Sequence, residues 1–135
     1  MTERDLTPST SGSCPCGRGE PYANCCGSLH SGNVAPTAER LMRSRYSAFV
    51  LGLDSYLLRS WHSSTRPRSL QLDHQVEWRR LVIEQTTAGG PFDSDGEVTF
   101  TAVARTPDGR LEQRERSRFV RDEQGRWSYI DGVEL

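Results

Sequence analysis

The sequence contains no lysine, so its 17 basic residues are all arginine, and 18 acidic residues bring the formal net charge to -1. Arginine can bind nucleic acid, but so complete an absence of lysine indicates compositional drift, and we do not expect nucleic acid as a direct target. The charges are uneven: eight Arg accompany four acids over 37–80, and seven Arg accompany eleven acids over 81–135. This asymmetry could steer an anionic ligand or partner, although solvated or locally paired arginines are the simpler explanation.

Long apolar runs are also missing. No stretch approaches the roughly 18 apolar residues that span a bilayer, and the first five residues lack the basic-then-apolar layout of a secretory signal. We therefore expect a cytoplasmic protein without membrane contact. The 135 residues suffice for one ordinary domain and a short appendage.

Catalytic signatures are absent as well. The sequence shows no Ser-His-Asp pattern, Walker loop or nucleotide-binding glycine fingerprint. His62 is the one histidine suited to proton transfer among the candidate pocket residues described below, and no motif ties a carboxylate to it. Catalysis has little support, and we assign no catalytic residue.

The composition divides the chain into four segments. Residues 1–13 have hardly any apolar side chain, which predicts a flexible tail. A cysteine-rich module follows at 14–27 and a polar linker at 28–36. Residues 37–135 carry the apolar periodicity of a folded domain.

Helical spacing begins after Pro36. Thr37 suits the N-cap position, and apolar residues recur at helical spacing from Met42 to Leu53, which predicts an amphipathic helix that Gly52 could end. Asp54 could cap a second, short helix. The apolar face of that helix consists of Leu57, Leu58 and Trp61.

From residue 78 onward the apolar period changes to two. This alternation predicts strands at 78–86 and 97–105, and Asp108-Gly109 predicts a hairpin into a strand at 110–121. A turn near Gln124-Gly125 leads to a last strand at 127–130. Helices followed by an antiparallel meander predict an α+β fold, with helices packed on one face of a curved antiparallel sheet.

Four cysteines lie close together in the sequence, as Cys14-Pro15-Cys16 and, after eight intervening residues, Cys25-Cys26. Four soft thiolates suit the tetrahedral preference of zinc. Disulfides are the alternative, but a reducing compartment argues against them and a vicinal bridge would be strained. A redox pair is a further alternative, and His30 could replace one thiolate as ligand. We expect one structural Zn²⁺ on the four cysteines.

The pattern Cys-x-Cys-Gly-x-Gly-x-x-Tyr-x-x-Cys-Cys at 14–26 resembles the SEC-C zinc motif at the C-terminus of the SecA translocation ATPase. In that family the last ligand is His or Cys. The resemblance implies Cys14, Cys16, Cys25 and Cys26 as the zinc ligands. It also implies that Tyr22 is the aromatic residue that packs beneath the metal.

The remainder of the chain resembles the bacterial YchJ-like family. The matching stretches are 41–49, 56–58, 61–67, 115–119 and 125–132. The resemblance implies a SEC-C module joined to a cone-shaped α+β domain of the nuclear-transport-factor type, in which a curved sheet wraps helices and leaves a pocket. The family has no assigned activity, so function stays open.

A cluster of donors and aromatic residues could line an anion-binding pocket in that cone. Its candidate members are Arg43, Arg45, Tyr46, Trp61, His62 and Arg66. The alternative is structural, because arginine and histidine at helix ends often bind loop carbonyls, and Trp61 could simply fill the core.

Two functions are compatible with these features. The first is a zinc-binding adaptor whose module contacts a protein partner, such as a chaperone, the ribosome or a nascent chain, through Arg18 and Tyr22. The second is a domain that binds a small anionic ligand, or an enzyme, with its site in the pocket of the cone.

Overall fold

The computed structural model describes residues 12–135, so residues 1–11 of the predicted flexible tail lie outside the described residues. The last residues of that predicted tail are paired. Ser13 forms an isolated β-bridge with Pro21, and the Gly12 carbonyl accepts from the Tyr22 N–H at 2.9 Å. In the described part of the chain, no helix is long and apolar enough to cross a membrane.

The central helix, α2 (Ala38–Leu51), begins and ends as its sequence predicts. The Thr37 hydroxyl accepts from the Arg40 N–H at 3.1 Å, and Gly52 ends the helix in the left-handed region with φ 73°. The prediction for α3 (Asp54–Arg59) is wrong in two details. The helix ends before Trp61, which was expected on its apolar face. Leu53 occupies the N-cap position, and the Asp54 carboxylate instead accepts from the N–H of Ser55.

Four strands form one antiparallel sheet in the order β1-β2-β3-β4. Their bounds are β1 Glu77–Ala88, β2 Asp95–Thr106, β3 Gly109–Arg121 and β4 Trp127–Glu134. The hairpin predicted at Asp108-Gly109 joins β2 to β3 and is confirmed. Register shifts interrupt β1 twice and the β3–β4 pairing once, and such bulges bend strands, which accounts for the curvature of the sheet.

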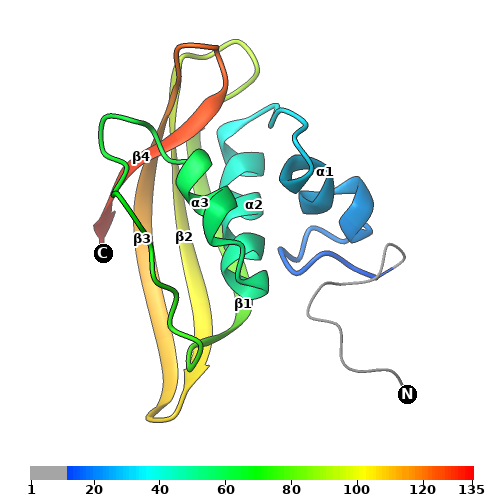
Figure 1. Ribbon diagram of the computed structural model, residues 1–135, viewed down its shortest axis with the longest axis vertical. Helices are drawn as coiled ribbons and strands as arrows, with labels where there is room; N and C mark the ends of the chain where they lie inside the picture. Colours follow the sequence, from blue (N-terminus) through cyan, green and yellow to red (C-terminus); the bar gives the residue numbers. More distant parts are fainter. Residues whose placement is uncertain (1–11) are drawn as a thin grey trace.

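Helix α2 lies between the sheet and the N-terminal segment (Figure 1). One face of β2 packs toward the helices, and its alternating residues are buried: Val98, Phe100, Ala102 and Ala104. The predicted α+β fold, with helices on one face of a curved antiparallel sheet, is confirmed.

The cysteine-rich segment contains two short helices, η1 (Tyr22–Asn24) and α1 (Cys26–His30). Helix α1 packs on η1 and on α2. The linker predicted at 28–36 therefore begins inside a helix, because residues 28–30 still belong to α1. The division of the chain into separable segments stays a prediction.

Candidate metal centre and candidate pocket

The four cysteine sulfurs converge on one point. All four side chains are buried, and their Sγ atoms lie within 4.8 Å of one another, with 3.6 Å between those of Cys16 and Cys25. Four sulfurs bound tetrahedrally at 2.3 Å from one ion would be about 3.8 Å apart. The sulfurs therefore need to move by at most about 1 Å to close on a metal ion, and the cluster could hold one.

Local backbone geometry brings the two pairs of cysteines together. The Cys14 N–H donates to the Glu20 carbonyl at 2.9 Å, which closes a loop that turns through Gly17 and Gly19. Both glycines have positive φ, 82° and 92°, a conformation that side chains disfavour. Cys25 and Cys26 lie at the junction of η1 and α1, facing this loop.

The thiols differ in acidity because they hydrogen-bond one another. Contacts from Cys16 and Cys26 lower the pKa of Cys14 well below its usual range. The same contact with Cys14 raises the pKa of Cys16 to about 11, and Cys14 and Cys16 raise that of Cys26. Without a cation the cluster favours a thiolate at Cys14 over one at Cys16 or Cys26, so a divalent ion is what would hold these sulfurs deprotonated together.

Two arginines lie against the cluster. Arg18 is exposed and donates through Nη1 to the Cys25 sulfur at 3.5 Å. Arg43, a predicted pocket residue, instead extends from α2 to the module, where it donates to the Cys16 carbonyl at 3.0 Å and to Glu39 at 2.9 Å. Arg43 therefore attaches the module to α2.

His30 attaches the module to α2 and is not part of the sulfur cluster. Its Nδ1 lies 2.6 Å from the Tyr22 hydroxyl and its Nε2 lies 2.8 Å from the Ser44 carbonyl. The carbonyl can only accept, so Nε2 carries the proton and the Tyr22 hydroxyl donates to Nδ1. In residues 12–135, the group of side chains placed to hold a metal consists of the four cysteines. Tyr22 packs against the core cluster that includes the four cysteines. The position beneath a metal that the SEC-C resemblance implies for it stays a prediction.

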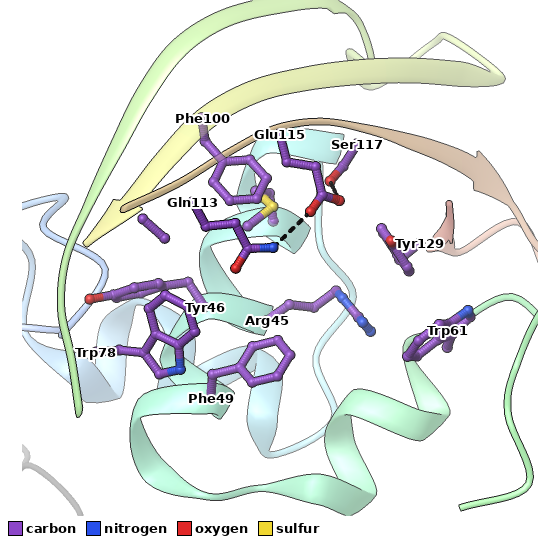
Figure 2. A pocket seen from close by; sticks show the side chains of 12 residues that line it. Arg45, Tyr46, Phe49, Trp61, Trp78, Phe100, Gln113, Glu115, Ser117 and Tyr129 are labelled. Atoms are coloured by element: carbon purple, nitrogen blue, oxygen red, sulfur yellow. Dashed lines mark hydrogen bonds between the residues drawn. The ribbon is translucent and has the colours of Figure 1, made fainter. Parts of the chain in front are cut away.

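A cavity of about 320 Å³ opens between α2 and the sheet. One end is apolar or aromatic and is lined by Met42, Tyr46, Phe49, Trp78, Phe100 and Ala102. At the other, polar end Arg45 extends toward Trp61 and Tyr129, with Glu115 and Ser117 on the sheet side, and Gln113 lies beside Phe100 between the two ends (Figure 2).

Arg45 enters the polar end of the pocket from α2 and is only 5% exposed. Its Nη1 donates to the Leu57 carbonyl at 2.8 Å and to the Ser60 hydroxyl at 2.7 Å. The guanidinium carbon lies 5.2 Å and 4.6 Å from the ring centroids of Trp61 and Tyr129. Burial lowers the pKa of Arg45 to about 10, so it keeps its charge at neutral pH.

Glu115 lines the same end of the pocket from β3. Its Oε1 accepts from Gln113 Nε2 at 3.2 Å, and its Oε2 accepts from the Ser117 hydroxyl at 3.0 Å. Burial, and then the charge of Glu115, raise the pKa of Tyr129 to about 12. The pocket therefore holds a guanidinium and a carboxylate, each held by neighbouring polar groups.

The structure brings three of the six candidate pocket residues together: Arg45, Tyr46 and Trp61. Arg43 faces the module. His62 and Arg66 lie outside this cavity and line a second one together with Trp61. Arg66 donates to the Trp61 carbonyl at 2.8 and 3.0 Å, and His62 Nδ1 lies 2.8 Å from the Ser64 hydroxyl. Both shape the loop after α3.

Sequence reasoning missed the residues that the sheet contributes to the pocket. Gln113, Glu115 and Ser117 alternate along β3 on the side of buried Phe119. The sequence did contain a signal for them. Residues two apart on a strand point to the same face, so polar residues in phase with a core residue such as Phe119 were candidates to point into the pocket.

The comparisons with known proteins agree with this architecture. The family model for the YchJ middle NTF2-like domain matches residues 37–132. UPF0225 proteins of Streptomyces coelicolor and Corynebacterium glutamicum are 54% and 49% identical to this chain, each over 120 residues that cover 88% of it and 93% and 94% of those proteins.

Two solved structures share the fold across nearly the whole chain. A SEC-C motif containing protein from Rhodopseudomonas palustris matches with a TM-score of 0.77 at 29% identity, covering 92% of this chain and 99% of that one. Another, from Psychrobacter arcticus, matches with a TM-score of 0.74 at 28% identity, covering 90% and 82%. The chain therefore belongs to the YchJ-like family, and residues 37–132 form its NTF2-like domain.

Proposed function

We propose that this chain is a binding protein whose N-terminal segment is held by one structural Zn²⁺ on Cys14, Cys16, Cys25 and Cys26. The observation that carries the proposal is the convergence of four buried sulfurs within 4.8 Å. Such a closed set of thiolates leaves no coordination position for water or substrate, so the metal would stabilise structure and would not act as a Lewis acid.

Zinc content tests the metal assignment directly. Protein purified under reducing conditions should contain one equivalent of zinc per chain by elemental analysis, because soft thiolates select this ion among the common divalent metals. The Cys26→Ser variant, treated identically, should contain much less. Well below one equivalent in the wild-type protein, or iron in place of zinc, would contradict the assignment.

The function that we propose for the metal is to present the loop at residues 17–20 to a protein partner, such as a chaperone, the ribosome or a nascent chain. All four residues of this loop are exposed. The metal and the Arg18 contact with Cys25 would hold the loop rigid, and a preordered surface loses less entropy on association. Tyr22 contributes less directly, since its hydroxyl is used by His30.

Arg18→Glu should reduce the capture of a partner about tenfold, because it reverses the central charge of the loop. The measurement is affinity capture from bacterial lysate, comparing bound proteins between wild type and variant at equal zinc content. Arg68→Glu, at an exposed position outside the helices and strands, is the matched control and should change nothing. Equal capture by wild type and Arg18→Glu would exclude this loop as the contact surface.

Ligand binding in the pocket is a second candidate function, and one observation favours it. Arg45 brings a charge to the wall of a cavity of about 320 Å³, and in residues 12–135 it forms no ion pair with a carboxylate. The charge of Glu115, in the same cavity, acts on Arg45 only from beyond ion-pair distance. A buried charge without a direct partner is costly, so we infer that a ligand completes the site. The adaptor and ligand-binding functions are compatible in one chain.

A further inference from the structure

The polar end of the pocket contains two opposite charges that are not paired with each other. We propose that the pocket selects an amino-acid-like zwitterion, a small molecule with a carboxylate, an ammonium group and one large apolar side chain. This inference rests on the pocket being a ligand site, the second function proposed above. It follows from the positive charge, the negative charge and the apolar end of the cavity.

Arg45 provides the site for the carboxylate. Within residues 12–135, Nη1 is the one nitrogen of Arg45 that donates hydrogen bonds, to Leu57 and Ser60. The N–H groups of Nε and Nη2 are therefore available to a ligand. The rings of Trp61 and Tyr129 stabilise the cation but do not neutralise it. A ligand carboxylate would supply the missing charge, and charge-assisted hydrogen bonds are strongest where water is excluded.

Glu115 provides the site for the ammonium group. Gln113 and Ser117 are neutral donors that orient its carboxylate in the pocket without cancelling its charge (Figure 2). In residues 12–135 no ion pair within 4.0 Å joins Glu115 to Arg45. A simple anion would meet repulsion from Glu115, whereas a zwitterion would match both groups.

The apolar end sets the size and nature of the side chain. Figure 2 shows Tyr46, Phe49 and Trp78 grouped apart from the end where Arg45 approaches Trp61 and Tyr129. The volume of about 320 Å³ equals that of about ten water molecules at ~30 Å³ each. The cavity thus accommodates one amino-acid-sized molecule.

Four probes that share a phenyl group and differ in charge test the inference. They are phenylalanine (zwitterion), phenylacetate (anion), phenethylamine (cation) and 2-phenylethanol (neutral). Each is titrated at neutral pH into the full chain carrying its metal, and the dissociation constant is measured from NMR shifts of the Trp61 and Trp78 indole N–H groups. Phenylalanine should bind at least about tenfold more tightly than any other probe, because it alone satisfies both charges.

The Glu115→Gln variant tests whether the preference for phenylalanine arises from the carboxylate in the pocket. It should lower the affinity for phenylalanine to about that for phenylacetate. Glu112→Gln, on the same strand but with its carboxylate bound to Arg110 on the surface, is the matched control and should leave the affinities unchanged. Arg45→Lys should weaken phenylalanine and phenylacetate alike, but Arg45 also holds Leu57 and Ser60, so Glu115→Gln carries the test if Arg45→Lys fails to fold.

The outcomes separate the inference from the ligand-binding function beneath it. If phenylacetate, phenethylamine or 2-phenylethanol binds as tightly as phenylalanine, the pocket is a ligand site but the zwitterion preference is wrong. If phenylalanine binds best but Glu115→Gln leaves that preference intact, the assignment to Glu115 is overturned. If no probe shifts either indole signal at millimolar concentration, both the inference and the ligand-binding function fail.

Discussion

Removing the metal from the four-cysteine centre is expected to lower the free energy of unfolding by about 4 kcal/mol or more, because loss of a structural metal is among the few single changes with effects this large. Cys16, Cys25 and Cys26 are fully buried and belong to the same apolar cluster as Leu41 and Met42 of α2. Chelation should therefore loosen the module and also weaken the packing of α2. Chemical denaturation with and without chelator measures the change.

The Cys26→Ser variant is the control for chelator side effects. It should show most of the loss without chelator, and added chelator should then change its stability little, since the metal is already lost. A wild-type chain whose stability does not respond to chelator would contradict a structural metal.

Hydrogen exchange in the chelated protein tests the boundary predicted at residues 28–36. We expect amides of 12–30 to lose protection from exchange. Amides in the centre of β2 and β3 should keep it, because these two strands are hydrogen-bonded to a neighbouring strand on both sides. His30 and Arg43 connect the module to α2, so some loss should extend to that helix. Equal loss of protection throughout the sheet would mean that the module belongs to one cooperative core.

The elements that could be predicted from the sequence depend on local chemistry. Thr37 and Gly52 fix the ends of α2 through contacts within a few residues, and Asp108-Gly109 encodes its hairpin in the turn itself. The convergence of the four cysteines could be predicted for a different reason, because four thiols at this spacing suit a metal site. Their convergence needed no knowledge of the rest of the fold.

The pocket could be predicted only in part, because it combines segments far apart in the sequence. Trp61 was found from its position at a helix exit and Arg45 from its place on the preceding helix. Arg43, two residues from Arg45, faces the opposite side of α2 and binds Cys16. A spacing of two residues corresponds to about 200° around a helix, so one of the pair had to leave the pocket. Glu115 and Tyr129 required knowledge of which strand face points inward.

Close approaches of backbone to backbone were also invisible in the sequence. Gly96, at the start of β2, pairs with Ala88 and packs directly on Gly89 in the turn from β1. A Cβ on Gly96 would lie 2.5 Å from Gly89 Cα and 2.7 Å from Gly89 N. The N–H of Gly89 donates to Asp95 and its carbonyl accepts from the Ala38 N–H at the start of α2. Gly89 is thus held from two sides and cannot retreat without breaking one of these hydrogen bonds.

Gly96→Ala is accordingly expected to lower the free energy of unfolding by about 3 kcal/mol, at the upper end of the usual cost of overpacking, because fixed backbone and not a flexible side chain must yield. Gly90→Ala is the matched control in the same turn: its Cβ would meet only Asp93 Oδ2, at 3.3 Å, so its effect should stay below about 1 kcal/mol. Urea denaturation of both variants, each carrying its metal, gives the comparison. If the two are equally stable, the turn is not held against α2 as tightly as these hydrogen bonds require. If Gly96→Ala is less stable than Gly90→Ala, the rate of amide exchange at Ala38 should also be higher in Gly96→Ala. The reason is that the Gly89 carbonyl, which accepts the Ala38 N–H, is the group forced to move.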